Sequence, residues 1–319
     1  MKEIIIKKND EGQRLDKFLI KSFPSLPHSL IYKSIRKKRI KLNNKRCSAS
    51  DKLSANDILH LYINDEFLLV NPNFDFLAAS SNLDIIYEDE NILLINKPVG
   101  LIVHEDENEK IDTLINQIKK YLYEKNEFDP ENELSFTPAL VNRIDRNTQG
   151  IVIAAKNFET LKILNQKLKN REIKKFYLCL VHGVLDNKEA VLKNYLIKDK
   201  SENIVYLFNN PTETSKIILT KYRVLETFNN ISMLEIELLT GRKHQIRAHM
   251  AYINHPLVGD IKYGGREINS RYSSKFQALI SYKIIFDFSS DAGILNYLKN
   301  KEFEINGAKD ILTSDKVDF

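Results

Sequence analysis

The sequence predicts an α+β protein made of two parts: a small basic domain of two helices and a hairpin, and a larger body with a mixed, largely antiparallel central sheet, flanking helices and loops. In the body, from residue 83 onward, β-like runs outnumber helical ones, and several follow one another directly. Residues 1–63 carry 15 Lys and Arg against 6 Asp and Glu, whereas the rest of the chain carries 33 against 37. Residues 64–82, with Pro72, several asparagines and a closing Ser-Ser-Asn, are typical of a linker.

The composition is typical of a globular chain in a reducing compartment. Its 319 residues are enough for one large or two medium domains. Cys47 and Cys179, the only two cysteines, are far apart, so neither a disulfide framework nor a metal-ligand spacing follows from them. The apolar run at 4–6 is too short for a signal peptide, and no stretch approaches 18 uncharged apolar residues. We therefore expect a cytoplasmic protein without a membrane partner.

The small domain is expected to span residues 12–63. Apolar residues at helical spacing in RLDKFLIKSF predict a first helix, which Pro24 ends. Ser29 is the expected N-cap of a second short helix over LIYKSIRKK. Two alternating runs, RIKLNNKR and DILHLYI, follow as strands, and Asn43-Asn44 predicts a tight turn.

The basic charge of this domain is concentrated between residues 33 and 46, where eight Lys or Arg occur without an acid. Such a cluster favours an electrostatic anchor for a polyanion. A solvated face without a partner is the alternative. The eight residues are Lys33, Arg36, Lys37, Lys38, Arg39, Lys41, Lys45 and Arg46.

The body is expected to span residues 83–303, followed by a C-terminal tail at 304–319. Apolar runs predict strands at 91–98, 150–156, 174–183 and twice within 216–240, where the two could pair. Amphipathic spacing predicts helices at 111–125 and 157–171, the second with Asn157 as its cap. Gly241 lets the chain turn from a strand into a further helix.

The stretch VNRIDRNTQG, at 141–150, places Asp145 between Arg143 and Arg146. Flanking guanidiniums favour the ionised form of a carboxylate. An ionised carboxylate can act as a nucleophile or a base. An Arg-Asp pair that fixes a turn is the structural alternative.

A second cluster lies in LLTGRKHQIRAHM, at 238–250. Arg242, Lys243, His244 and Arg247 surround the start of the predicted helix, whose free N–H groups favour an anion such as phosphate. A solvated basic helix is the alternative. His244 and His249 are five residues apart with no carboxylate near them, so no metal site is predicted.

Two further observations bear on the chemistry. Tyr177, in KKFYLCLVHG, is either a core aromatic or a platform on which a base stacks. The phosphate-binding patterns GxGxxG and GxxxxGK[ST] and the hydrolase patterns GxSxG and HExxH are absent from the sequence. The common nucleotide-dependent and hydrolase classes are therefore not predicted.

Five blocks, taken in this order, resemble a known family: INKPVGLIVH, VNRIDRNTQGIVIAAK, KKFYLCLVHG, TGRKHQIRAHM and NHPLVGDIKYGG. They are similar to the ribosomal large-subunit pseudouridine synthases, most closely those of the C type. The N-terminal RLDKFL and SLIYKSIRKKRIKLNNKR resemble the small RNA-binding module first described in a ribosomal small-subunit protein. Together the resemblance covers most of residues 12–63 and 85–290.

The resemblance implies the fold of the pseudouridine synthase catalytic domain and a reaction without metal or cofactor. Uridines in large-subunit ribosomal RNA, or in its assembly precursor, would be converted to pseudouridine after the base flips into the site. Asp145 matches the family's essential aspartate, Tyr177 the tyrosine that stacks on uracil and Arg247 the basic partner of the aspartate. Ile246 matches an apolar pocket residue. We expect Arg143 to bind the RNA substrate, and the eight basic residues of the small domain to bind RNA.

The chain departs from the family pattern at two places. Asn142 stands where the family usually has His, and Ile280-Ser281 replace the usual pair near the end of the catalytic domain. The sequence leaves open whether Asp145 attacks the uracil or the ribose, and which uridines are modified. A non-catalytic RNA-binding ribosome-assembly factor on the same scaffold is the second hypothesis. A nuclease is the third, although only one key acid is apparent.

Overall fold

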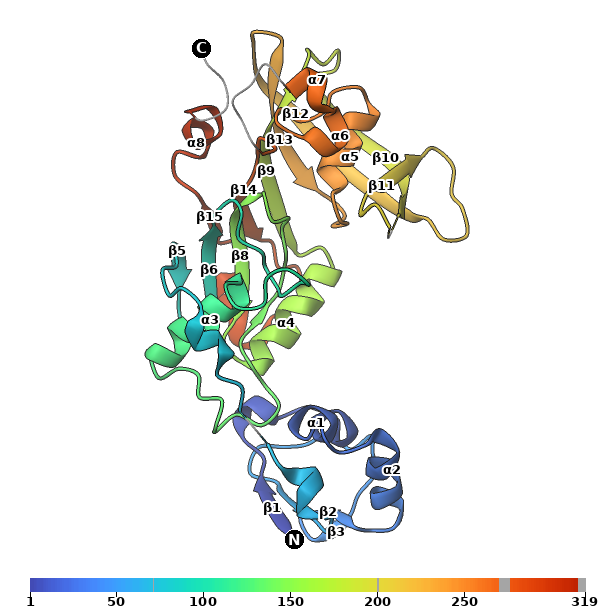
Figure 1. The fold of residues 1–319 in the computed structure, drawn as a ribbon, viewed down its shortest axis with the longest axis vertical. Helices are drawn as coiled ribbons and strands as arrows, with labels where there is room; N and C mark the ends of the chain where they lie inside the picture. Colours follow the sequence, from blue (N-terminus) through green and yellow to red (C-terminus); the bar gives the residue numbers. More distant parts are fainter. Residues whose placement is uncertain (71, 200, 270–275, 315–319) are drawn as a thin grey trace.

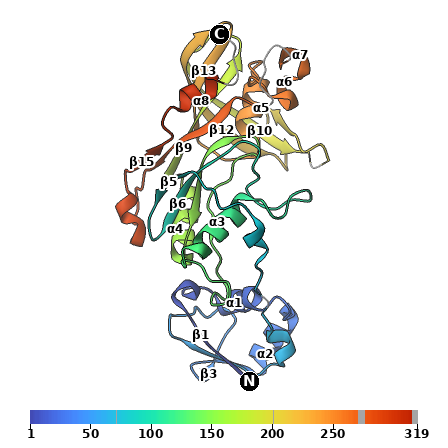
Figure 2. The same cartoon turned by 60° about the vertical axis from the view of Figure 1, so that its left-hand side comes forward.

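The computed structural model describes residues 1–70, 72–199, 201–269 and 276–314. A small N-terminal domain lies at one end of the molecule and a longer body at the other, and the described part of the C-terminal region lies in the body (Figures 1 and 2). The predicted α+β class is confirmed, since both parts combine an antiparallel or mixed sheet with a few helices.

The small domain packs two helices against a four-stranded sheet. Its helices are α1 (Leu15–Ser22) and α2 (His28–Arg36), and its strands, in sheet order, are β1 (Lys2–Ile5), β4 (Ile58–Leu61), β2 (Ile40–Leu42) and β3 (Lys45–Arg46). Phe18 and Leu19 of α1 are fully buried between helix and sheet. Asn43 and Asn44 have φ of 50° and 62° and form the predicted turn between β2 and β3, because asparagine tolerates left-handed backbone.

Two details of this domain differ from the sequence-based expectation. Strand β1 pairs with β4, so the sheet begins ten residues before the expected boundary at 12. The apolar run at 4–6 is short, and its partner strand lies more than 50 residues later in the chain, so the local sequence does not reveal this pairing. Ser29 is not the cap of α2, because that helix begins at His28, and the carbonyl of Pro27 accepts its first hydrogen bonds from Leu30 and Ile31.

The segment 64–82 is packed rather than free. It forms two 3-10 turns, η2 (Asp65–Leu68) and η3 (Asp75–Ala78). Leu68 joins the core of the small domain, and Phe76 joins a core of the body. Each end of the expected linker is thus held by a different part of the molecule.

A second connection holds the small domain to the body. The side chain of Asn9 donates to Glu133 at 2.9 Å, and that of Gln13 donates to Ser135 at 2.6 Å. Ser135 also donates to the buried carboxylate of Asp10. Leu134 packs against the small-domain core between these polar contacts.

The body is built on one large mixed sheet. Its strands, in sheet order, are β11 (Val205–Phe208), β10 (Glu189–Lys198), β12 (Lys216–Phe228), β13 (Ile231–Leu238), β9 (Ile173–His182), β14 (Leu279–Phe286), β8 (Gln149–Ala155), β6 (Ile92–Lys97) and β5 (Ile85–Glu88), with β15 (Glu302–Glu304) on β14 and β7 (Ala139–Leu140) on β8. Among the named strands of the described residues, only β14 and β8 pair in parallel; an isolated parallel bridge also joins Ile102 and Thr113. The two strands predicted within 216–240 are β12 and β13, and they pair antiparallel as expected.

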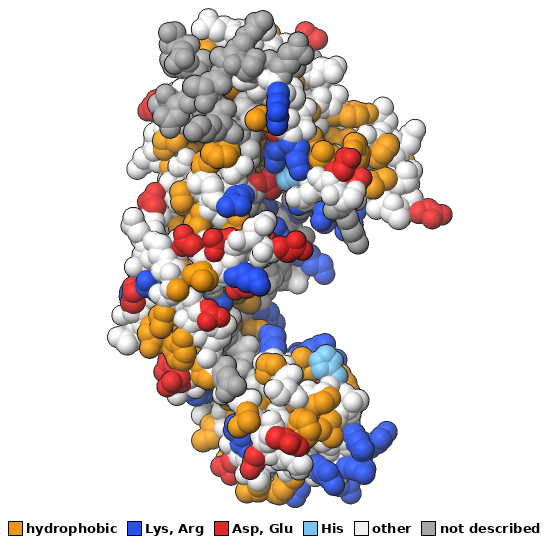
Figure 3. Space-filling view, in the orientation of Figure 1, with side chains coloured by type: hydrophobic (Ala, Val, Ile, Leu, Met, Phe, Trp, Pro, Cys, Tyr) orange, Lys and Arg blue, Asp and Glu red, His pale blue; other side chains and the backbone are white. Residues whose placement is uncertain are grey.

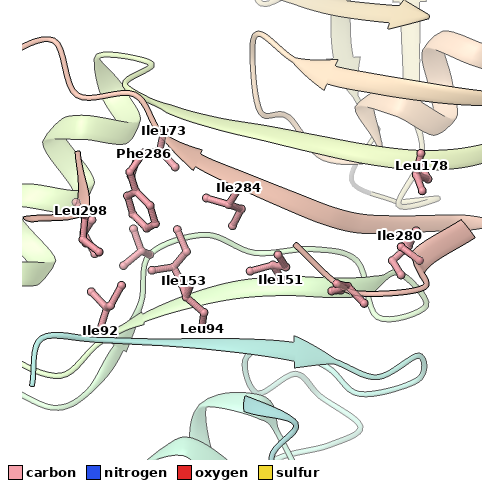
Figure 4. Close-up of a cluster of buried hydrophobic side chains, with 14 of the residues drawn as sticks. Ile92, Leu94, Ile151, Ile153, Ile173, Leu178, Ile280, Ile284, Phe286 and Leu298 are labelled. Carbon is pink, nitrogen blue, oxygen red and sulfur yellow. The ribbon is translucent and has the colours of Figure 1, made fainter. Parts of the chain in front are cut away.

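Both faces of this sheet are covered, so its central strands are apolar on both sides. On β6, Ile92 and Leu94 face one core, and Leu93 and Ile95 face the other. Figure 4 shows side chains of the first core, among them Ile92 and Leu94. The helical elements of the body are α3 (Leu114–Glu124), α4 (Phe158–Lys169), α5 (Gln245–Tyr252), α6 (Ile261–Gly264), α7 (Arg266–Asn269), α8 (Ala308–Ser314) and the 3-10 turn η4 (Gly293–Leu298). Asn157 caps α4 as predicted, because its side chain accepts from the Thr160 N–H at 2.8 Å.

The described part of the expected tail, 304–314, belongs to the body. Ile305, Ala308 and Leu312 are buried in the first core. Ala308 and Leu312 are four residues apart on one side of α8, and that side packs against the sheet, while Ile305 lies in the stretch just before the helix. The stretch is therefore not a solvated tail; residues 315–319 lie outside the described residues.

Gly150 lies where β8 begins beside β14. Its φ is +129°, and a Cβ at this position would lie 2.3 Å from the backbone oxygen of Ser281. Only glycine allows this approach. Ile280 and Ser281, the atypical pair, are both buried at this junction. They pair with the first two residues of β8, the strand that follows the loop of residues 141–148.

Candidate active site

A cavity of about 670 Å³ opens on the body and brings together all five residues predicted for the site: Arg143, Asp145, Tyr177, Ile246 and Arg247. This size is typical of a ligand-binding cleft. The residues come from the loop between β7 and β8, from β9 and from α5. Chain segments far apart in sequence thus meet at one place because β9 lies between β13, which leads into α5, and β14, which pairs with β8.

Asp145 occupies the loop that leads into β8, with its side chain about one quarter exposed (26%). Its Oδ2 accepts from Nη1 of Arg247 at 3.3 Å. Its other oxygen, Oδ1, makes no hydrogen bond to the part of the chain that the structure describes. One oxygen of the carboxylate is therefore held by the protein, and the other is available to a molecule in the cavity.

Arg247 is itself fixed by a second carboxylate. Its Nε and Nη2 donate to Asp260 at 2.7 and 2.9 Å, in a bidentate pair that is almost fully buried. Burial disfavours the charged guanidinium, but the hydrogen bonds and charges of Asp260 and Asp145 outweigh burial and raise the pKa of Arg247. Asp260 also caps α6, since it accepts from the N–H groups of Lys262 and Tyr263. The guanidinium beside Asp145 is thus permanently charged and unable to rotate away.

The arginines that flank Asp145 in sequence do not form ion pairs with it. Arg146 turns away and donates from Nε to the carbonyl of Gly100 at 2.9 Å. Arg143 is exposed at the cavity and forms no ion pair with the described residues. The flanking guanidiniums, which the sequence pattern alone suggested as partners of the carboxylate, point to different sides of the loop. The contact to Asp145 comes from Arg247, the partner that the family resemblance implies. Arg143 is left free for a ligand.

Tyr177 and Ile246 form an apolar wall of the cavity. Tyr177 is 6% exposed and Ile246 is 4% exposed, and both also belong to the second core of the body. Burial raises the pKa of Tyr177 to about 12, so its ring stays neutral. Tyr177 is consequently both a core aromatic and a surface on which a planar ligand can stack.

Two side chains anchor the loop that carries Asp145. Asn142, the atypical residue, accepts from the N–H of Ile153 at 2.7 Å and donates to the carbonyl of Ile151. Lys97 is fully buried, and its ammonium donates to the carbonyls of Pro98, Leu101 and Arg146. The loop is therefore tied to β8 on one side and to the end of β6 on the other.

Lys97 and Asp260 are not among the five residues predicted for the site. A lysine that ends the apolar run ILLINK was a signal for Lys97, since a strand buried on both faces rarely takes a charge without partners. Asp260 is the one acid of the block NHPLVGDIKYGG, and a partner for a buried arginine is expected to be acidic. The sequence does not reveal which carbonyls Lys97 donates to or which guanidinium Asp260 binds.

A rim of basic residues surrounds the cavity. Lys169, Lys175, Lys198, Arg242 and Lys243 contribute to its lining. Burial lowers the pKa of Lys175, which makes no hydrogen bond or ion pair within the described chain. Cations without acidic partners at a cavity favour an anionic ligand.

The eight basic residues of the small domain lie on α2, on the loop after it and on the β2–β3 hairpin. All but Lys41 are exposed, and none forms an ion pair with any described acid. Figure 3 shows Lys and Arg side chains gathered on this part of the small domain, below a hollow that separates it from the upper body. The positive field of this surface is therefore not neutralised by the protein itself.

The described residues also bear on metal and membrane binding. No group of three or more His, Cys, Asp or Glu side chains there is arranged to hold a metal ion. Across the same residues, the helices are too short or too polar to cross a bilayer.

Comparisons with known proteins agree with both parts of the chain. Residues 91–252 match the family model for RNA pseudouridylate synthase, and residues 13–59 match that for the S4 domain. An uncharacterized RNA pseudouridine synthase of Mycoplasma capricolum is 34% identical to this chain, over 94% of this chain and 96% of the relative. The ribosomal large subunit pseudouridine synthase C of Vibrio parahaemolyticus is 32% identical, over 81% and 79%. The solved structure of human RNA pseudouridylate synthase domain containing 1 has a similar fold, with a TM-score of 0.53 at 20% identity, and covers 77% of this chain and 97% of its own.

Proposed function

This chain belongs to the family of RNA pseudouridine synthases, and we propose that it isomerises specific uridines of large-subunit ribosomal RNA with Asp145 as its catalytic residue. The observation that carries the proposal is the cavity in which Asp145, Arg247 and Tyr177 meet, with Asp145 and Arg247 in direct contact. The large-subunit substrate is supported by relatives that bear the names ribosomal large subunit pseudouridine synthase C and D.

The proposed reaction exchanges one glycosidic bond for another. The N1–C1′ bond of the uridine breaks, the uracil turns, and a C5–C1′ bond forms. The hydrogen on C5 leaves as a proton to water, and N1 gains a proton. No electrons are transferred and no phosphate is cleaved, so the scheme is written without a metal or cofactor.

The carboxylate supplies the reactive group in this scheme. Oδ1 of Asp145 faces the substrate as a nucleophile or base, while Arg247 holds Oδ2. The bidentate pair with Asp260 keeps the guanidinium beside Asp145 when negatively charged RNA phosphates compete for it. Positioning therefore comes from the protein before the substrate arrives.

The target base must leave its stack to reach this oxygen. Extrusion of a base costs a few kcal/mol, and stacking on an aromatic ring returns about 1–3 kcal/mol. Tyr177 presents such a ring, and Ile246 lines the same cavity. Arg143 and the basic rim line the same cavity, and we expect them to contact the phosphates on either side of the flipped nucleotide.

The small domain is proposed to add affinity for ribosomal RNA or its assembly precursor in the cytoplasm. Its family match, the S4 domain, and its unpaired basic surface support this role. Changing the three basic residues at 37–39 to glutamine should weaken RNA binding and lower the slope of log affinity against log salt by about 2–3. A matched control changes three exposed lysines of the body, Lys299, Lys301 and Lys309, and should leave the slope unchanged. Equal slopes for the two variants would contradict the assignment.

The catalytic part is tested by release of tritium from ribosomal RNA labelled with [5-³H]uridine. The unmodified chain should release tritium and leave pseudouridine, whereas Asp145→Asn should lose at least about 10³-fold in rate and keep its affinity for RNA. Asp186→Asn, which changes an exposed acid away from the cavity, is the matched control and should be fully active.

The alternative, a non-catalytic assembly factor, makes the opposite prediction. It requires that the unmodified chain bind ribosomal RNA while releasing no tritium. That result with correctly folded protein would overturn the proposed activity and favour the binding role.

A further inference from the structure

His244 lies beside Asp145 and has a left-handed backbone conformation, which is unusual for a residue with a side chain. It precedes α5 with φ of 52° and ψ of 18°, in the left-handed region that side-chain-bearing residues seldom adopt. Its side chain is buried, and Nε2 lies 3.8 Å from Oδ2 of Asp145. The strained backbone therefore aims an imidazole at the oxygen that Arg247 also contacts.

The tautomer of this imidazole follows from its other neighbour. Nδ1 of His244 is 2.9 Å from the hydroxyl of Tyr263, and that hydroxyl oxygen accepts from the N–H of Val205 at 3.0 Å. A phenol has one proton to donate, and within the described residues Nδ1 is the acceptor it reaches. Tyr263 consequently donates to Nδ1. A neutral imidazole must then carry its proton on Nε2, where it faces Asp145.

The surroundings keep the ring neutral. Burial lowers the pKa of His244 to about 4, and the charges of Arg247, Lys243 and Lys262 oppose the attraction of Asp145. Tyr263 faces the ring with a hydroxyl that stays protonated, because burial raises its pKa to about 12. The group next to the carboxylate is therefore an N–H donor without a charge.

We propose that His244 is a positioning residue of the uridine reaction, whose Nε2–H, set by Tyr263, hydrogen-bonds to Oδ2 of Asp145 when RNA fills the cavity. The inference rests on the proposed function. The present 3.8 Å is beyond hydrogen-bond distance, and such contacts commonly shorten in the substrate complex. With Arg247 and His244 both on Oδ2, the carboxylate cannot rotate, and Oδ1 is fixed as the reacting oxygen.

Two substitutions at 244 separate the donor from the fold. Asparagine suits the left-handed backbone and can still accept from Tyr263, but its short amide does not reach the place of Nε2. Glutamine carries an N–H at that place. His244→Asn should lower the single-turnover rate by about 10-fold to 100-fold, with unchanged RNA affinity and melting temperature. His244→Gln should recover most of that loss, and equal rates for the two variants would overturn the proposal.

The role of Tyr263 is tested by a double-mutant cycle. Tyr263→Phe keeps the ring that packs over Arg247 but removes the hydroxyl. It should slow the reaction about 10-fold when residue 244 is histidine and have little effect when it is glutamine, because an amide N–H needs no tautomer to be set. Tyr252→Phe, which removes an exposed hydroxyl bonded to Asn209, is the matched control and should be neutral. Equal losses in both backgrounds would contradict the proposed link.

The tautomer can be read without any activity. A long-range ¹H–¹⁵N NMR spectrum of the full chain, with the signal assigned by its loss in His244→Asn, should show a neutral ring protonated at Nε2 near pH 7. An imidazolium, or a ring protonated at Nδ1, would overturn the proposal. If the unmodified chain releases no tritium, the proposed function fails. The NMR spectrum would then still report the tautomer of His244, because it does not depend on activity.

Discussion

Replacing Lys97 with methionine tests whether a buried ammonium holds the loop that carries Asp145. Lys97 is fully buried and donates to the carbonyls of Pro98, Leu101 and Arg146 at 2.7, 2.8 and 2.9 Å. Arg146 directly follows Asp145, so one of these bonds fixes the backbone beside the carboxylate. Methionine has a similar length and fills the same space but donates nothing.

The expected loss follows from the number of bonds. Each carbonyl left without its charged donor costs about 1–3 kcal/mol. Burial lowers the pKa of Lys97 to about 7, so removing the buried charge returns part of this cost. We therefore expect the free energy of unfolding to fall by about 3 kcal/mol, which corresponds to about 5–6 °C in melting temperature for a unit of this size. Loosening of the Asp145 loop should also lower the rate of tritium release by at least about 10-fold.

The assay is thermal unfolding followed by circular dichroism, with tritium release measured well below the melting temperature. Lys120→Met is a matched control, because Lys120 donates to a single carbonyl, that of Ala79 at 2.8 Å, away from the cavity. It should cost about 1 kcal/mol and leave the rate unchanged. Equal melting temperatures and equal rates for the two variants would refute the idea that Lys97 organises the loop.

Three further predictions concern the frame around the site. Asp260→Asn should lower the free energy of unfolding by about 3 kcal/mol and the rate by at least about 10-fold, since it leaves Arg247 buried without its bidentate partner; wild-type rates would contradict it. Gly150→Ala should lower the melting temperature by more than about 6 °C, because the new Cβ would lie 2.3 Å from a backbone oxygen of the neighbouring strand; unchanged melting would show that β8 and β14 can separate without cost. Glu172→Gln should destabilise the chain at pH 7. The Lys167 ammonium holds the pKa of Glu172 below its ordinary value of 4.5, so this stabilisation is complete above that pH and is lost as the pH falls toward the folded-state pKa. The gap in melting temperature between the variant and the unmodified chain should therefore close in acid, and a constant gap from pH 7 to pH 3 would contradict it.

Much of the fold could be predicted because its signals are local. Alternating and helical apolar patterns located β9, β12, β13 and α4, and Asn43-Asn44 specified its turn from backbone preference alone. The errors lie where pairing is remote: β1 finds its partner more than 50 residues later, and α8 buries its apolar side against the body sheet. A local pattern does not contain the identity of a distant partner.

The candidate site shows the same division. Spaced sequence blocks pointed to Asp145, Tyr177, Ile246 and Arg247, and the comparisons confirm the family they indicate. The guanidiniums nearest to Asp145 in sequence are not the ones that contact it. Successive side chains of the loop point in different directions. Arg247, on α5, is instead directed toward Asp145 by its ion pair with Asp260.

The sequence by itself determined the kind of chemistry, since it specifies one acid, one aromatic ring and many cations in an order typical of an RNA-modifying family. Only the tertiary structure decided which oxygen of Asp145 contacts Arg247, and which hydroxyl lies beside Nδ1 of His244. Residue types depend on the chain alone. Hydrogen-bond partners at about 3 Å depend on how strands and helices distant in sequence pack together, and that packing is a property of the whole fold.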